Sequence, residues 1–89
     1  MYNLKMSLKS LKGKQILVTG GTGSFGYHFI KKIHKMNCKI IVFSRDELKQ
    51  FEMRNKFKSK NISYIIGDVR EKNSLDIAMR NVDYVFHAA

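Results

Sequence analysis

The sequence predicts an α/β fold in which a parallel sheet of about four strands carries helices on both faces. Short aliphatic runs alternate along the chain with segments whose apolar residues recur at helical spacing. This alternation is typical of strand–helix–strand units, whose right-handed crossovers leave neighbouring strands parallel. A glycine-rich segment, residues 20–26, joins the first aliphatic run to the first helical segment. With strands numbered along the chain, the expected order in the sheet is 3-2-1-4.

Four strands are expected because each aliphatic run is short and ends at polar or glycine residues. Unbroken apolar runs suit strands that are buried on both faces of a parallel sheet. The fourth strand would lie at an uncovered edge, which invites pairing with another chain and gives the sequence the character of the first part of a larger domain. The expected strands are Gln15–Thr19, Lys39–Phe43, Ile62–Ile66 and Tyr84–His87.

Three helices are expected between these strands. The first runs from about Phe25 to Met36 and places Phe25, Phe29, Ile33 and Met36 on one face. Asn37 is its expected stop, because asparagine tolerates the left-handed conformation. The last helix is short, near 74–80.

The middle helix is predicted from a capping signal. Ser44 and Glu47 have the spacing of a capping box. In this motif, each of the two side chains accepts a hydrogen bond from the backbone N–H of the other residue at the start of the helix. From there the helix is expected to continue to about Phe57 and to bury Leu48 and Phe51.

The composition fits one small domain with a basic surface. A chain of 89 residues suffices for one hydrophobic core and not for two. The net charge of +10 favours phosphorylated ligands in general. We expect no nucleic-acid partner, because the lysines are dispersed and no recognition motif accompanies them.

Several site classes are not expected. No spacing of His, Cys, Asp and Glu resembles a metal site, and His87 is expected to be packed rather than catalytic. We expect the single cysteine, Cys38, to be a small buried apolar residue. A lone cysteine also fits a reducing compartment. No apolar run approaches the roughly 20 residues that span a bilayer. We therefore expect a cytoplasmic protein without a membrane partner.

The glycine-rich segment is the central motif. Residues 19–26 read TGGTGSFG, with Gly20, Gly23 and Gly26 in the pattern G-x-x-G-x-x-G between a strand and a helix. In that context the pattern predicts a pyrophosphate site of the Rossmann type. Gly20 would allow the tight turn, Gly23 the approach of the pyrophosphate, and Gly26 close packing of the helix on the strand. The helix N-terminus would face the phosphates, with hydroxyl donors from Thr22 and Ser24.

The end of the second strand carries the expected ribose-reading residues. Rossmann domains place such a residue about 20 positions after the glycine segment, where this sequence reads Ser44-Arg45-Asp46. An arginine can pair with a 2′-phosphate through two hydrogen bonds, which favours NADP. Asp46 stands beside it, and an acid there would instead favour the 2′-hydroxyl of NAD. The sequence favours NADP and leaves NAD as the alternative.

Two further segments follow strands. Asp68, after the third strand, could accept a hydrogen bond from an adenine amino group, and Val69 could pack on the ring. Small residues after the fourth strand would let a ligand approach the backbone. We therefore divide the chain into an N-terminal extension, residues 1–13, and the N-terminal part of an NAD(P)-binding Rossmann domain, residues 14–89.

These motifs together resemble a known family. TGGTGSFG, then GDVR at 67–70, then D-x-V-x-H-A-A at 83–89 resemble the extended short-chain dehydrogenases/reductases, which act largely on nucleotide sugars. The stretch SRDELKQFEM at 44–53 is similar to the inverting UDP-N-acetylglucosamine 4,6-dehydratases of pseudaminic acid synthesis. The resemblance runs from about Leu11 to Ala89.

The resemblance implies a partial Rossmann fold that binds NADP, and a set of residues for each part of the cofactor. Those implied for the pyrophosphate are Thr22, Gly23, Ser24 and Phe25. Those implied for the adenosine 2′-phosphate are Ser44, Arg45, Asp46, Glu47, Leu48 and Lys49. Asp68 and Val69 would meet the adenine, and Ala88 would approach the cofactor from the fourth strand.

The resemblance also implies a reaction that these residues cannot complete. Removal of water from a UDP-sugar by an internal redox cycle needs a Tyr-x-x-x-Lys pair, which in the family lies beyond the fourth strand. Only Tyr27 and Lys31 fit that spacing, on the helix after the glycine segment. We expect the 89 residues to be inactive alone. A UDP-sugar 4-epimerase fragment and a stand-alone nucleotide-binding module, self-associating through the fourth strand, are the alternatives.

Overall fold

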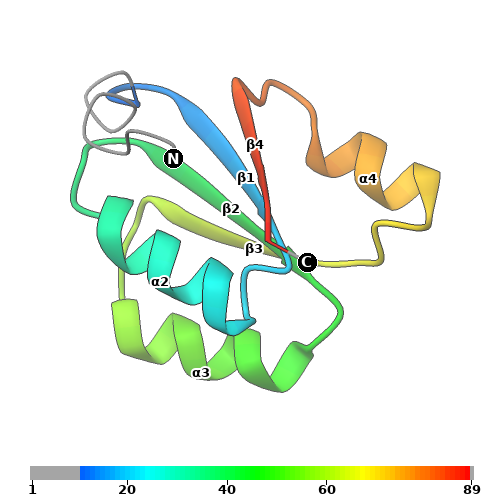
Figure 1. Cartoon of the computed structure of the whole chain (residues 1–89), viewed down its shortest axis with the longest axis horizontal. Helices are drawn as coiled ribbons and strands as arrows, with labels where there is room; N and C mark the ends of the chain where they lie inside the picture. Colours follow the sequence, from blue (N-terminus) through cyan, green and yellow to red (C-terminus); the bar gives the residue numbers. More distant parts are fainter. Residues whose placement is uncertain (1–10, 89) are drawn as a thin grey trace.

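The computed structural model describes residues 11–88 and shows a four-stranded parallel sheet with helices on both faces (Figure 1). The strand order is β3-β2-β1-β4, which confirms the predicted order. Every predicted strand is present, and β2 is one residue longer than expected. In chain order the elements are β1 (Gln15–Thr19), α2 (Ser24–Ile33), β2 (Lys39–Ser44), α3 (Glu47–Phe57), β3 (Ile62–Ile66), α4 (Lys72–Ala78) and β4 (Tyr84–His87).

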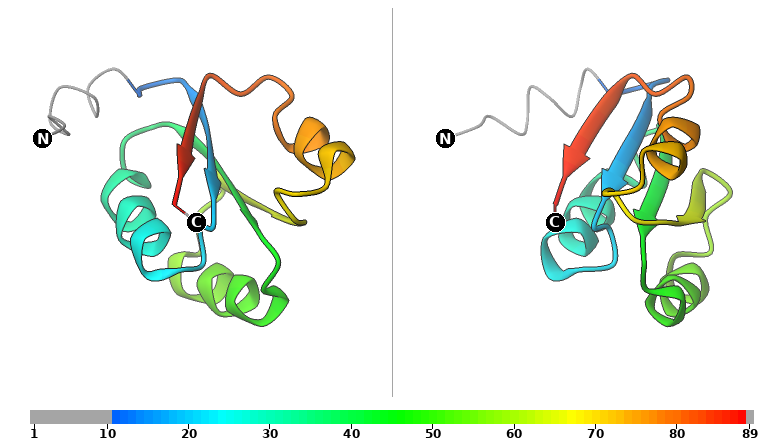
Figure 2. Two further views of the ribbon diagram at one scale, coloured as in Figure 1. Left: turned by 45° about the vertical axis from the view of Figure 1, so that its right-hand side comes forward. Right: turned by 90° about the vertical axis from the view of Figure 1, so that its right-hand side faces the viewer.

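The core has two layers, one on each face of the sheet. α2 and α3 lie side by side on one face, and α4 covers part of the other (Figures 1 and 2). Because side chains alternate along a strand, Ile16 and Val18 of β1 join the core under α2 and α3, whereas Leu17 joins the core under α4. Cys38 is buried in the larger core, as predicted.

The N-terminal boundary is described only in part. Residues 1–10 of the predicted extension lie outside the described residues. Leu11 is buried against the core, and the Gly13 N–H donates to the Asn37 carbonyl at 2.9 Å. The turn before β1 is therefore tied to the loop that precedes β2.

α2 is shorter than predicted and presents a different face to the sheet. It ends at Ile33 rather than Met36, and its buried residues are Gly26, Ile30 and Ile33. Phe25, which the helical spacing placed on one face with Ile33, is 77% exposed. Gly26 belongs to the buried face, where its backbone packs against the glycine segment. Asn37 does adopt the left-handed conformation, with φ 55°, but in the loop after the helix.

α3 corrects the predicted capping box. Ser44 is the last residue of β2, and the N-cap is Asp46, whose side chain accepts a hydrogen bond from the Lys49 N–H at 3.0 Å. The buried residues are Gln50 and Met53, whereas Leu48 and Phe51, predicted to be buried, are exposed. Gln50 takes the buried position because its amide finds hydrogen-bond acceptors at the ends of β2 and β3.

The last helix and strand complete the sheet. α4 covers Lys72–Ala78 rather than 74–80, so it begins and ends two residues earlier than predicted. β4 pairs with β1 and forms an edge, as expected from the strand order. Tyr84 and Val85 on this edge are exposed.

Candidate functional site

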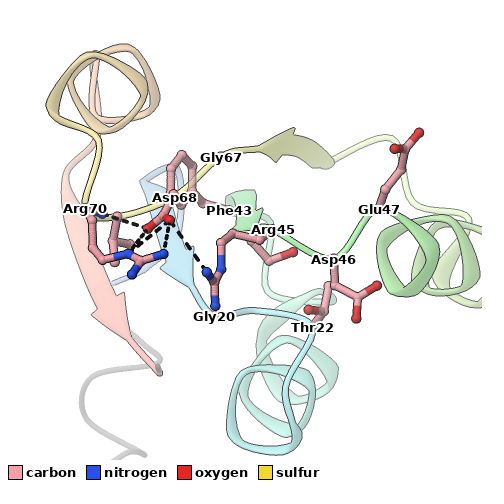
Figure 3. A pocket seen from close by; sticks show the side chains of 11 residues that line it. Gly20, Thr22, Phe43, Arg45, Asp46, Glu47, Gly67, Asp68 and Arg70 are labelled. Atoms are coloured by element: carbon pink, nitrogen blue, oxygen red, sulfur yellow. Dashed lines mark hydrogen bonds and ion pairs between the residues drawn. The ribbon is translucent and has the colours of Figure 1, made fainter.

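A cleft of about 880 Å³ opens at the carboxyl ends of β1, β2 and β3 (Figure 3). Three segments line it: the loop after β1, the junction of β2 with α3, and the loop after β3. Open α/β sheets bind ligands at this edge, because loops from neighbouring parallel strands converge there. The lining residues are Gly20, Thr22, Phe43, Ser44, Arg45, Asp46, Glu47, Gly67, Asp68, Val69 and Arg70.

The glycine segment folds into a tight loop. Gly20 has φ 65°, a left-handed conformation that favours glycine, and its N–H donates to the Phe43 carbonyl at 2.9 Å. The Gly23 N–H donates back to the Gly20 carbonyl at 3.0 Å. The tight turn predicted at Gly20 is confirmed.

Gly26 is required for a reason that differs from the predicted one. A Cβ on Gly26 would lie 2.5 Å from the Gly21 Cα and 2.7 Å from the Gly20 carbonyl oxygen. Its close contact is therefore with the loop and not with the strand. Gly21 makes the strand contact, since a Cβ there would lie 2.8 Å from Val42 Cγ1.

The amino end of α2 is suited to a negatively charged group. Its N-cap, Gly23, contributes no side-chain hydrogen bond, and no acidic residue lies in its first turn. The amides of that turn therefore keep donor capacity, and the positive end of the helix dipole is not neutralised. This donor set fits a phosphate group.

A carboxylate between two arginines forms a cluster of charged side chains in the cleft (Figure 3). Arg70 donates to Asp68 from Nη2 at 2.7 Å, from Nε at 3.1 Å, and from its backbone N–H at 2.9 Å. Arg45 Nη1 lies 3.6 Å from Asp68 Oδ2. The hydrogen bonds from Arg70 lower the pKa of the Asp68 carboxyl from 3.8 to about 2. Asp68 is therefore an ionised acceptor throughout the physiological pH range.

The junction of β2 with α3 is held by a buried amide. Gln50 Nε2 donates to the Ser44 hydroxyl at 3.0 Å and to the Ile65 carbonyl at 2.9 Å. Asp46 is fixed as the N-cap of α3. Arg45 therefore extends from a backbone position that is restrained on both sides.

The carboxyl end of β4 lies beside that of β1. The Ala88 N–H donates to the Thr19 carbonyl at 2.9 Å, and the Thr19 hydroxyl is hydrogen-bonded to His87 Nδ1. His87 is exposed, so the expectation that it is packed is wrong. Its ring is hydrogen-bonded to the buried Thr19 side chain. Within residues 11–88, no group of three or more His, Cys, Asp or Glu could hold a metal ion.

The structure brings eight of the fifteen predicted site residues together. Those that line the cleft are Gly20, Thr22, Ser44, Arg45, Asp46, Glu47, Asp68 and Val69. Those predicted but outside its lining are Gly23, Ser24, Phe25, Gly26, Leu48, Lys49 and Ala88. Sequence reasoning assigned no role to Phe43, Gly67 and Arg70. Of these, only Arg70 carried a signal, because an arginine two residues after an aspartate can pair with it across a turn.

The comparison with known families gives one match. Residues 16–89 match the model of a family described as polysaccharide biosynthesis protein. The chain belongs to this family.

No helix among the described residues is long and apolar enough to cross a membrane.

Relatives of the chain are named as enzymes that act on UDP-sugars. The chain is 59% identical over 80 residues to a UDP-N-acetylglucosamine 4,6-dehydratase (inverting) of Campylobacter jejuni strain 81-176, covering 86% of this chain and 24% of that protein. It is 49% identical to a UDP-glucose 4-epimerase of Rickettsia bellii strain OSU 85-389, covering 85% and 24%. The predicted resemblance to the inverting dehydratases is confirmed, and the chain spans about a quarter of the length of these relatives.

Solved structures confirm the Rossmann-type architecture. The crystal structure of Pen from Bacillus thuringiensis superposes with a TM-score of 0.85 at 39% identity, covering 89% of this chain and 25% of that one. The epimerase Mth375 of Methanothermobacter thermautotrophicus superposes with a TM-score of 0.77 at 26% identity, covering 94% and 25%. The described residues thus correspond to one part of larger folds.

Proposed function

We propose that this chain is the NADP-binding portion of a nucleotide-sugar 4,6-dehydratase that acts on UDP-N-acetylglucosamine, with inversion, in surface glycan biosynthesis. The observation that carries the proposal is the cleft, where the glycine loop and Arg45 meet at the carboxyl ends of neighbouring strands. The 59% identity to an inverting dehydratase supports this substrate class.

The residues present fit a nicotinamide dinucleotide. The loop at Gly20, with the uncapped start of α2, offers backbone donors for a pyrophosphate. The cleft between Arg45 and Val69 would take the adenosine, and Asp68 would accept from the adenine amino group. When bound, such a cofactor supplies hydride transfer. This chain's residues would bind and orient its adenosine half.

The geometry of β2 favours NADP over NAD. β2 ends at Ser44, so Arg45 is the first residue after the strand. The carboxylate of Asp46, which would otherwise favour a ribose hydroxyl, accepts the capping hydrogen bond of α3. Lys49, in the first turn of α3, adds a second positive charge four residues after Arg45.

The proposal assigns binding and not turnover to these 89 residues. Tyr27 and Lys31 lie on α2 and do not line the cleft, and the Tyr27 ring packs against Phe57 at 5.5 Å. The pair is therefore in no position to serve the nicotinamide end. Dehydration of UDP-N-acetylglucosamine by the 89-residue chain alone would contradict this assignment.

A UDP-sugar 4-epimerase portion is the second candidate, favoured by the 49% identity to the Rickettsia bellii protein. Both candidates share the cofactor site and differ in the sugar chemistry. Assay of the longer protein with UDP-N-acetylglucosamine separates them, because a dehydratase releases water to form a 4-keto-6-deoxy product and an epimerase conserves the sugar's composition.

Self-association through the β4 edge is measured by sedimentation of the purified chain.

The cofactor assignment is tested by calorimetric titration of the 89-residue chain with NADP and with NAD. We expect tighter binding of NADP, and an Arg45→Ala variant should lose roughly tenfold or more in NADP affinity with little change for NAD. Arg80→Ala is the matched control, because Arg80 is exposed and lies outside the cleft lining. Equal affinities for the two cofactors in the wild type would contradict the choice of NADP.

A further inference from the structure

The two arginines that face Asp68 are not equivalent. Arg70 uses Nε, Nη2 and its backbone N–H, so both oxygens of the carboxylate accept hydrogen bonds from it. Arg45 makes one approach at 3.6 Å, which is an ion pair longer than a hydrogen bond. The hydrogen bonds of the carboxylate are therefore made by Arg70, and Arg45 is held by an ion pair without a hydrogen bond.

Exposure separates the three side chains in the same way. The Asp68 side chain is 14% exposed, whereas Arg45 and Arg70 are 69% and 74% exposed. The carboxylate is thus the fixed point of the cluster. Arg70 is anchored to it because it follows two residues later in the same turn. Arg45 comes from the end of β2 and can leave the carboxylate while its backbone stays in place.

We propose that Arg70 is a positioning residue for selectivity toward a 2′-phosphorylated adenosine: it satisfies Asp68, and so leaves the Arg45 guanidinium available to the phosphate. This inference rests on the proposed function and deepens it. Its physical basis is the charge within this cluster of three side chains, where the Asp68 carboxylate faces two guanidinium groups and one positive charge remains unmatched. Asp46 and Glu47 also line the cleft, but among the described residues no ion pair joins either of them to Arg45. Nothing in this role requires Arg70 to touch the ligand.

Loss of Arg70 would make Arg45 the main partner of the Asp68 carboxylate. Asp68 would then keep its negative charge with Arg45 as the nearest cation, and the pair would shorten into a charge-assisted hydrogen bond. A 2′-phosphate would have to break that bond and would approach an unneutralised carboxylate. A ligand that lacks the 2′-phosphate would meet neither penalty.

The test uses two small probes that differ by one phosphate, adenosine 2′,5′-bisphosphate and adenosine 5′-phosphate, titrated into the 89-residue chain by NMR. Arg70→Ala should weaken the bisphosphate on the order of fivefold, as expected for one exposed ion pair, and leave the monophosphate within about twofold. Arg70→Lys, which keeps the charge but not the two-pronged geometry, should recover part of the loss. Arg80→Ala removes the same charge elsewhere and should change neither affinity.

A second variant makes the inference specific to Asp68. In Asp68→Asn/Arg70→Ala no carboxylate remains to capture Arg45, so the ratio of the two affinities should return to at least the wild-type value. Arg70→Gln repeats the test with a longer neutral side chain if Arg70→Ala is destabilised, which the unfolding midpoint reports.

The outcomes separate the two proposals. If the wild type binds neither probe, the proposed cofactor site is wrong, and this inference fails with it. If the wild type prefers the bisphosphate and Arg70→Ala weakens both probes equally, or neither, only the role of Arg70 is overturned. A double variant that stays unselective would also overturn it, because Asp68 would then not be the intermediary.

Discussion

The first turn of α2 touches the glycine loop through backbone alone: a Cβ on Gly26 would lie 2.5 Å from the Cα of Gly21. The atoms that this Cβ would meet, in Gly20 and Gly21, belong to the backbone and cannot rotate away. Gly26→Ala should therefore displace the helix start and lower the free energy of unfolding by about 1–3 kcal/mol, as for overpacked interiors. Urea unfolding followed by circular dichroism measures this change. An unchanged midpoint would show that the loop accommodates the added methyl group with no loss of stability.

Gly23 offers a contrast on the same loop. A Cβ there would lie 3.4 Å from the Gly20 carbonyl oxygen, and its φ of −74° suits any residue. Gly23→Ala should change stability by no more than about 0.5 kcal/mol. If the pyrophosphate approaches this backbone, the same variant should lose cofactor affinity. Calorimetry and urea unfolding of the two glycine variants together separate a structural glycine from a binding one; a Gly23→Ala variant with normal cofactor affinity would remove Gly23 from the site.

Gln50 is expected to be the most sensitive position on α3. Gln50→Leu keeps the volume but leaves the Ser44 hydroxyl and the Ile65 carbonyl without this donor, which should cost about 1–3 kcal/mol. Leu48→Ala, at an exposed position on the same helix, should stay within about 0.5 kcal/mol. Thermal unfolding ranks the two variants. A larger loss of stability in Leu48→Ala than in Gln50→Leu would instead support the burial of Leu48 that its hydrophobicity predicts.

The Asp68–Arg70 pair predicts a pH dependence in acid. The pKa of Asp68 is lowered from 3.8 to about 2, so the folded state binds this proton less tightly than the unfolded state. The resulting stabilisation is present above about pH 4 and is lost as the pH falls toward 2. Arg70→Ala should raise the pKa of Asp68 toward 3.8 and shrink this acid-labile part of the stability. Carbon-detected NMR titration of the carboxyl group checks the shift; a wild-type pKa near 3.8 would contradict it.

The centre of the sheet could be predicted from sequence because β1 and β2 are short, apolar and mostly buried. Val18 and Val42 lie in unbroken aliphatic runs, and such runs form central strands whichever helices cover them. The order of the strands followed from the alternation of strands and helices, which is typical of the doubly wound fold. These features depend on local pattern, which the sequence carries directly.

The helix faces could not be predicted in the same way. Hydrophobicity alone favoured burial of Phe51, but the neighbouring Gln50 is buried because acceptors from β2 and β3 surround its amide. Those acceptors are brought together only by tertiary structure. The contact of Arg45 with Asp68 escaped for the same reason, since it depends on the loop after β3 reaching the end of β2.

The central claim is that the cleft at the carboxyl ends of the strands binds NADP. Titration of the ¹⁵N-labelled chain with NADP, followed by amide chemical shifts, tests it most directly. We predict that the largest changes fall on Thr22, on the 44–47 segment and on the 67–70 segment, which line that cleft. Absence of any change at millimolar NADP, or changes centred on Lys39 and Lys60 away from the cleft, would contradict the account.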